Sequence, residues 1–128
     1  APTPEQVIIR LRGDNQKEEL LLAPDDLFFL SSADNYVQVV YRQSGKPTAM
    51  LLRSTLKKME EQLAAYPAFF RCHRMYLVNL QLVTSVSGNA QGLRLHLAGV
   101  EEVIPVSRSL TETVKEKLHH LSHSPQNA

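Results

Sequence analysis

The feature that most restricts the fold of this chain is the shortness of its apolar runs, which turn residues interrupt every few positions. Residues 36–41 are rich in β-branched and aromatic side chains, and residues 93–97 alternate between apolar and polar. Both patterns are typical of strands with one buried face. Gly, Ser, Asn and Asp gather between such runs, for example at residues 13–15, 43–46 and 88–92, as they do in tight turns. The sequence therefore predicts a mainly β fold of short antiparallel sheets.

Further strands complete this prediction. Residues 6–12 place Val7, Ile9 and Leu11 on one face of a strand. The others are predicted at residues 18–22, 48–52, 82–86, 100–104 and, as either a buried strand or a tight turn, 27–30. Residues 31–35 are expected to form a polar loop, because Ser, Asp and Asn favour turns.

The first of two predicted helices follows residue 53. Leu56, Met59 and Leu63 recur at helical spacing, which predicts one apolar stripe facing the core. Either Ser54 or Thr55 can cap its N-terminus. The helix is expected to end at the alanine pair before the next proline, because the residue that precedes proline disfavours helical geometry.

The second predicted helix lies near the end of the chain. It starts either at Ser107 or at a capping box made by Ser109 and Glu112, and it runs through Leu118. Residues 121–128 are polar and are predicted to form a flexible tail.

Length and composition fit one soluble domain. The 128 residues are predicted to comprise a linker at 1–5 and a domain at 6–120. No apolar run approaches the roughly 18 residues of a membrane-spanning helix, and the start lacks the pattern of a signal peptide. A single cysteine cannot form an internal disulfide, which fits a reducing cytoplasm.

The net charge of +1 hides an uneven distribution. Residues 1–41 carry three Lys/Arg against seven Asp/Glu, whereas residues 42–74 carry seven Lys/Arg against two Asp/Glu. Such a basic block suits an anionic partner such as nucleic acid. Two alternatives stay open at this point: a small β interaction module whose basic face meets an acidic protein, and basic side chains that are simply solvated.

Neither catalysis nor metal binding is expected. Cys72 and His73 are adjacent, and neighbours in an extended chain point to opposite faces, so they cannot form a nucleophile–base pair. Cys72 is then either a packing residue or a redox-sensitive point. His119 and His123 have helical spacing but lack the glutamate of a zinc-protease motif. No glycine-rich phosphate loop precedes a helix, and no cofactor is predicted.

The arginines of residues 71–74 are better candidates for function. Arginine binds guanine edges and phosphates through two donors at once. Arg108 follows at the start of the second predicted helix, where free backbone amides favour anions. Lys57 and Lys58 lie in the first turn of the other helix, where a cation opposes the helix dipole, so a functional reason is favoured.

These segments resemble the LytTR-type DNA-binding domain of bacterial transcription regulators. The resemblance extends from about Val7 to Leu118 and is most specific at residues 70–79 (FRCHRMYLVN) and 104–108 (IPVSR). Weaker matches lie at residues 27–30 (LFFL), 34–37 (DNYV) and 53–57 (RSTLK).

The resemblance implies a mainly β fold with two helices that inserts loops, rather than a recognition helix, into successive major grooves. Carried over residue by residue, the implied base contacts are Asn35, Tyr36, Arg71, Arg74 and Arg108. The implied phosphate contacts are Arg53, Lys57, Lys58, His73 and Ser107. His73 is assigned either to a phosphate or to a structural hydrogen bond, and Asn79 is expected to hold backbone rather than touch DNA.

The resemblance also implies a biological setting. Such domains are commonly the output half of a cytoplasmic response regulator, behind an N-terminal receiver or another sensory domain. The expected partner is double-stranded DNA with paired direct-repeat half-sites. Two copies then either contact each other as a homodimer on DNA or merely occupy adjacent half-sites.

Overall fold

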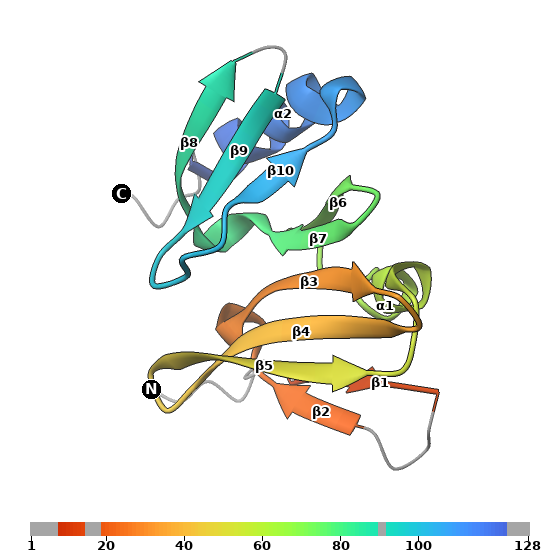
Figure 1. The fold of residues 1–128 in the computed structure, drawn as a ribbon. Helices are drawn as coiled ribbons and strands as arrows, with labels where there is room; N and C mark the ends of the chain where they lie inside the picture. Colours follow the sequence, from red (N-terminus) through yellow and green to blue (C-terminus); the bar gives the residue numbers. More distant parts are fainter. Residues whose placement is uncertain (1–7, 15–18, 90–91, 123–128) are drawn as a thin grey trace.

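The computed structural model describes residues 8–14, 19–89 and 92–122, and within them the chain forms three antiparallel sheets and two α-helices (Figure 1). The central sheet has the strand order β5-β4-β3-β7-β6. Its strands are β3 (Leu27–Ala33), β4 (Tyr36–Gln43), β5 (Lys46–Leu52), β6 (Phe69–His73) and β7 (Tyr76–Asn79). The predicted mainly β architecture is therefore confirmed.

Two smaller sheets cover the central one. A two-stranded sheet lies below it in Figure 1 and a three-stranded sheet, in the order β10-β9-β8, lies above it. Their strands are β1 (Ile9–Arg12), β2 (Glu19–Leu22), β8 (Val83–Asn89), β9 (Gly92–Leu97) and β10 (Ile104–Val106). The helices are α1 (Leu56–Gln62) and α2 (Thr111–Ser122), and short 3₁₀ turns are η1 (Pro24–Asp26), η2 (Leu80–Leu82) and η3 (Arg108–Leu110).

The central sheet separates two hydrophobic cores. One core joins it to β1, β2 and α1 and includes Leu11, Met59 and Leu77. The other joins its opposite face to the three-stranded sheet and α2 and includes Val78 and Val114. Leu77 and Val78 are neighbours in β7 and are 1% and 0% exposed, so this strand is buried on both faces. The predicted stripe on α1 and the inward face of β9 both contribute to these cores, as the sequence indicated.

The predicted polar loop at residues 31–35 is wrong. Ser31, Ser32 and Ala33 complete β3, and only Asp34 and Asn35 form the turn to β4. Ladder partners on both sides explain the difference, because Ser31 pairs with β4 and also with β7. Backbone hydrogen bonds from two neighbouring strands outweigh the local preference of serine for turns.

The strand predicted at residues 100–104 is also misplaced. The strand is β10, and its first residue, Ile104, pairs with Leu95 in the core. Residues 101–103 are exposed, and Glu102 instead accepts a hydrogen bond from the hydroxyl of Tyr76 at 3.0 Å. An apolar pattern alone does not show where a strand finds its partner.

The helix starts resolve two alternatives. Thr55 caps α1, because its hydroxyl accepts a hydrogen bond from the amide of Lys58 at 3.2 Å, whereas Ser54 is buried and its hydroxyl has no partner among the described residues. This helix ends at Gln62, slightly before the predicted alanine pair.

Neither predicted start of the second helix is observed. Ser107 precedes the 3₁₀ turn η3, and α2 itself begins at Thr111. The helix continues to Ser122 and so extends past the predicted end at Leu118. Arg108 therefore lies on a tight turn before the helix rather than on the helix.

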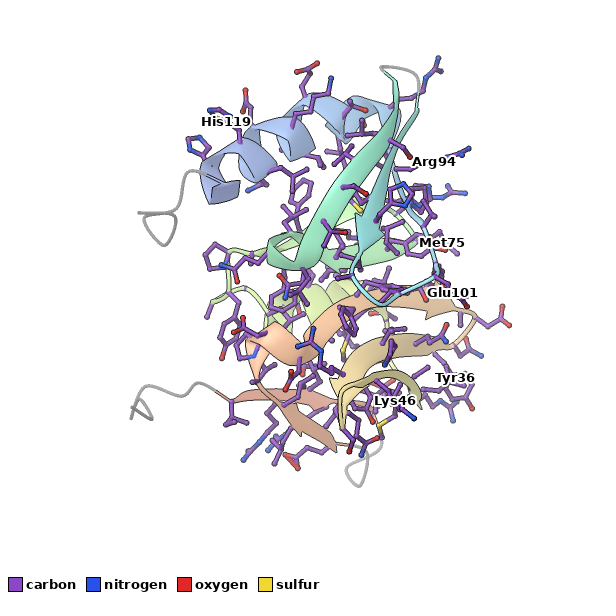
Figure 2. All side chains as sticks on the ribbon, turned by 90° about the vertical axis from the view of Figure 1, so that its left-hand side faces the viewer. Tyr36, Lys46, Met75, Arg94, Glu101 and His119 are labelled. Carbon is purple, nitrogen blue, oxygen red and sulfur yellow. The ribbon has the colours of Figure 1, made fainter. Side chains whose placement is uncertain are left out.

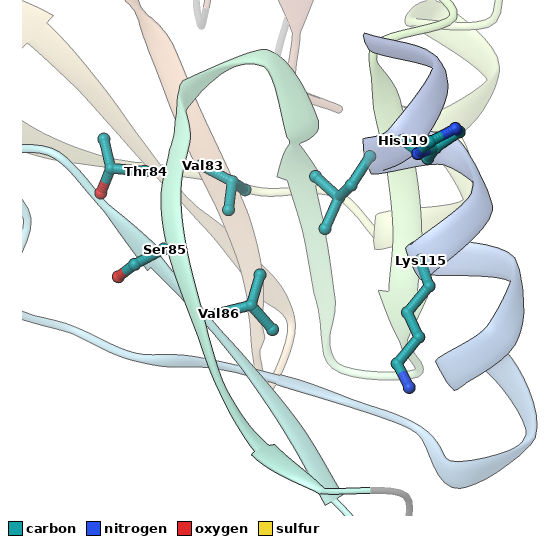
Figure 3. A pocket seen from close by; sticks show the side chains of 7 residues that line it. Val83, Thr84, Ser85, Val86, Lys115 and His119 are labelled. Carbon is teal, nitrogen blue, oxygen red and sulfur yellow. The ribbon is translucent and has the colours of Figure 1, made fainter. Parts of the chain in front are cut away.

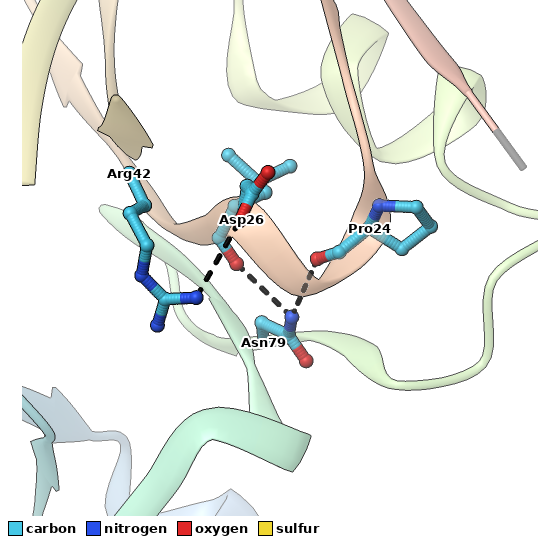
Figure 4. Close-up of polar contacts among 5 residues, drawn as sticks. Pro24, Asp26, Arg42 and Asn79 are labelled. Carbon is cyan, nitrogen blue, oxygen red and sulfur yellow. Dashed lines mark hydrogen bonds and ion pairs between the residues drawn. The ribbon is translucent and has the colours of Figure 1, made fainter. Parts of the chain in front are cut away.

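The side chain of Asn79, at the end of β7, is hydrogen-bonded to backbone carbonyls where the chain passes from η1 into β3 (Figure 4). Its amide nitrogen donates to the carbonyls of Pro24 and Leu27, both at 3.0 Å, and its side-chain oxygen accepts from the amide of Gln81 at 3.1 Å. The side chain is 1% exposed. The prediction that Asn79 holds backbone is confirmed.

Asn79→Ala is expected to lower the free energy of unfolding by about 2–3 kcal/mol, because the Leu27 carbonyl loses this buried hydrogen bond and the Gln81 amide loses its acceptor. Urea unfolding monitored by circular dichroism measures the change. Asn35→Ala is the matched control, since Asn35 is exposed on a turn, and its effect should stay within about 0.5 kcal/mol. Equal effects of the two substitutions would contradict the assigned role of Asn79.

Candidate nucleic-acid interface

Strand register brings two hairpin turns to the same end of the central sheet. β3 is antiparallel to both of its neighbours, with Ala33 opposite Tyr36 in β4 and Ser31 opposite Tyr76 in β7. The β3–β4 turn and the β6–β7 turn, which is formed by Arg74 and Met75, therefore lie side by side. Both appear on the right-hand side of Figure 1.

Two further segments reach the same end. β5 ends there, because Leu52 lies opposite Val37, and the chain passes through Arg53 into α1. The amide of Ser107 donates to the carbonyl of Cys72 at 2.8 Å, which places η3 beside the β6–β7 hairpin. Segments that are far apart in the sequence thus meet at one end of the molecule.

We call this region the basic end and define it as residues 34–36, 53–58, 71–75 and 107–108. It contains all ten residues predicted to contact DNA. Its four segments hold six Lys/Arg side chains and a single acidic residue, Asp34. Five of the seven cations in the basic block of the sequence therefore gather in space, whereas Arg42 and Lys46 lie at the β4–β5 hairpin, outside the basic end.

Several side chains of the basic end project without internal partners. Within the described residues, Arg74 and Arg108 are exposed and their guanidinium groups take part in no ion pair. Lys57 is exposed in the same way, and so are Asn35 and Tyr36, with Tyr36 41% exposed. Donors that no protein group satisfies are available to an external anion.

Met75 is a residue that the sequence did not single out. It is 41% exposed at the tip of the β6–β7 turn, next to Arg74. Figure 2 shows Met75 and Tyr36 on the same side of the molecule. An exposed apolar side chain between basic ones is unusual, and its position in a turn after FRCHR was the available signal.

Other predicted contact residues are engaged within the protein. Lys58 forms a 2.9 Å ion pair with Asp14, both side chains being about half exposed. The Nδ1 atom of His73 accepts a hydrogen bond from the amide of Met75 at 3.1 Å, so the structural alternative for this histidine is observed.

Arg71 is directed inward rather than outward. One Nη atom donates to the carbonyl of Arg74 at 2.9 Å, and the other lies 3.6 Å from a carboxylate oxygen of Glu60 on α1. Its Nε atom is buried without a partner among the described residues. Base contact by Arg71 stays a prediction, and the geometry gives this side chain a different task, which is argued below.

The side chain of Cys72 points away from the basic end into the core between the central sheet, the three-stranded sheet and α2. It is 0% exposed, and its thiol faces the carbonyl of Pro105 at 3.5 Å. Burial raises the pKa of Cys72 to about 12. The thiolate, which is the reactive form, is thereby suppressed. Burial likewise raises the pKa of Tyr76, whose hydroxyl donates to Glu102.

The described residues contain cavities away from the basic end. One of about 450 Å³ lies between β8 and α2, where Val83 and Val86 point toward the helix and Lys115 and His119 lie on it (Figure 3). Its lining holds no carboxylate or thiol. Nowhere in the described ranges do three His, Cys, Asp or Glu side chains gather to hold a metal, and His123 lies outside them.

No helix within the described residues is long and apolar enough to cross a membrane. Fold and site together define a small, mainly β domain that offers basic and polar side chains from turns and loops to an anionic partner.

Comparisons with known proteins identify that class more closely. A LytTr DNA-binding domain from a methyl-accepting/DNA response regulator of Bacillus cereus has the same fold, with a TM-score of 0.66 and 19% identity, covering 87% of this chain and 95% of that one. A Vibrio cholerae serotype O1 protein named an uncharacterized response regulatory protein is 34% identical over 99 residues, which span 77% of this chain and 38% of the relative. Residues 17–119 match the LytTr DNA-binding domain family.

The chain therefore belongs to the LytTr DNA-binding domain family, and it is a DNA-binding domain rather than an enzyme.

Cys72 is expected to resist iodoacetamide at pH 8 in the folded domain, reacting about 100-fold or more slowly than in the urea-unfolded chain, because burial removes both access and thiolate. Mass spectrometry of the quenched reaction measures the rate. Similar rates in the two states would show that the thiol is accessible and would restore a redox role.

Proposed function

We propose that this chain is the sequence-specific output domain of a bacterial transcriptional response regulator and that it reads major grooves with turns. Membership of the DNA-binding family and the name of the Vibrio cholerae relative support this proposal. The chain spans about two fifths of that relative, which leaves room for a receiver or other sensory domain in a full-length protein. A cytoplasmic location follows from the same proposal.

The observation that carries the proposal is the convergence of unpaired donors at the basic end. Arg74 lies on the tip of one two-residue turn, and Asn35 lies on the tip of its neighbour. Arg108 lies on the adjacent tight turn. Hairpin tips are narrow enough to enter a major groove about 12 Å wide. A recognition helix is not needed for such reading.

Chemistry assigns the roles of the exposed residues. Arg74 and Arg108 suit the O6 and N7 atoms of guanine, and Asn35 suits adenine. Tyr36 is a further donor, and Met75 offers an apolar contact of the kind that thymine methyl groups accept. Phosphate contacts are assigned to Arg53, Lys57, Lys58 and Ser107, which surround the tips.

The arrangement also bears on the DNA site. One domain presents one basic end, so a long operator is read by more than one copy. We assign each copy to one of two direct-repeat half-sites, with the copies either in contact as a homodimer or independent.

Selection of bound duplexes from a random pool tests the proposal directly, because it yields a motif and its spacing together. Failure to enrich any sequence would refute sequence-specific reading.

Arg74→Ala and Arg108→Ala are each expected to lose about 1–3 kcal/mol of binding free energy on the selected site and to relax preference at one base pair. Lys46→Ala is the control, since it removes one charge from the first residue of β5, which is not part of the basic end. Fluorescence anisotropy measures the affinities. An unchanged base preference in both arginine variants would contradict the assigned roles.

Lys57→Ala is expected to weaken binding to all sequences alike and to lower the slope of log K against log salt by about one, because one phosphate contact is lost. Titrations at several salt concentrations on specific and random duplexes measure both effects. Binding that does not depend on salt would instead favour a protein partner for the basic face.

A further inference from the structure

We propose that Arg71 is a positioning residue, which fixes the turn that carries Arg74 and links that turn to α1, instead of reading a base itself. The inference rests on the proposed role of Arg74 in DNA reading. It gives a role to Arg71, the more buried of the two arginines in residues 70–74 (FRCHR).

Three hydrogen bonds hold the backbone of the β6–β7 turn. The guanidinium of Arg71 donates to the carbonyl of Arg74 at 2.9 Å. The amide of Met75 donates to His73 at 3.1 Å, and the carbonyl of Met75 accepts from the amide of Ser32 in β3 at 2.9 Å. A two-residue turn at the edge of a sheet would otherwise leave these groups to water. The turn that presents Arg74 is thus held in one conformation from three sides.

A β-bulge explains why Arg71 can reach back to the turn. Phe70 pairs with Val78 and His73 pairs with Tyr76, so Arg71 and Cys72 together oppose the single residue Leu77. Bulges change the direction in which a side chain points. Here the side chain of Cys72 enters the core between the central sheet and the three-stranded sheet. The guanidinium of Arg71 instead lies between the β6–β7 turn and α1.

Glu60 completes the arrangement. Its carboxylate lies 3.6 Å from Arg71, and its side chain is about half exposed. A pair with this geometry contributes little to global stability, because solvent screens it. Its effect is orientation: it holds the guanidinium where one donor meets the carbonyl of Arg74. Glu61 is the next residue on α1, is exposed and makes no ion pair among the described residues.

The first test needs no DNA. Arg71→Ala is expected to raise the hydrogen-exchange rate of the Met75 amide about tenfold without changing protection in the core strands, since only the turn is released. Glu60→Gln should act in the same direction to a smaller extent, and it keeps the test valid if Arg71→Ala does not fold. Glu61→Gln is the matched control and should change nothing. Unchanged exchange of the Met75 amide in both Arg71→Ala and Glu60→Gln would overturn the proposal.

The second test separates positioning from base reading. If Arg71 acts through Arg74, Arg71→Ala should weaken specific binding about tenfold in the original background but less than about twofold in Arg74→Ala, a coupling that marks dependent residues. Both single variants should relax preference at the same base pair. If Arg71→Ala instead weakens specific binding about tenfold in both backgrounds and changes the preference at a different base pair from Arg74→Ala, Arg71 reads DNA itself.

The two tests also distinguish failure of this inference from failure of the proposed function. If Arg74→Ala leaves DNA affinity and base preference unchanged, the role of Arg74 in reading is wrong. The exchange rate of the Met75 amide would still report whether Arg71 holds the turn.

Discussion

The antiparallel pairing of β3 with β7 is the interaction on which the rest of the structure depends. It joins two hairpins into one sheet, although 45 positions of sequence separate Ser31 from its partner Tyr76. The same pairing sets both turns at one end. It also buries β7 on both faces, so that Leu77 and Val78 enter different cores. Asn79 closes the far end of this pair by donating to the backbone carbonyls of Pro24 and Leu27.

Gathering six cations at one end opposes folding, because like charges repel at short range. The fold reduces this repulsion without removing the charge that DNA needs. Asp14 offsets Lys58, and Glu60 offsets Arg71, both from outside the four basic segments. Arg74 and Arg108, the two arginines on turns, have no such partner among the described residues. The domain therefore pairs Lys58 on α1 and Arg71 in β6 with carboxylates and leaves the arginines at the tips available.

Much of this arrangement could be predicted from the sequence, because strand alternation and turn residues are local signals. The β fold class, the hairpin at residues 43–46 and a helix cap at either Ser54 or Thr55 all follow from patterns within a few positions. The errors arose where distant partners decide. Residues 31–33 became strand because β4 and β7 flank them, and residues 101–103 did not because no strand does. The inward direction of the Arg71 side chain could not be predicted from the sequence, since it depends on a β-bulge and on the carboxylate of Glu60, eleven positions away.

If turns read DNA, as proposed above, the domain meets a difficulty that a recognition helix avoids. A helix satisfies its own backbone groups, whereas the tip of a turn does not, and a flexible tip must be ordered when it binds. Here the β6–β7 tip is ordered during folding, by a donor from β3 and by a donor and an acceptor from its own hairpin. The arginine at the tip then loses only side-chain freedom on entering the groove. In this proposal Arg71 and His73 serve recognition through the backbone they hold, so a short basic segment needs more polar residues than it presents to DNA.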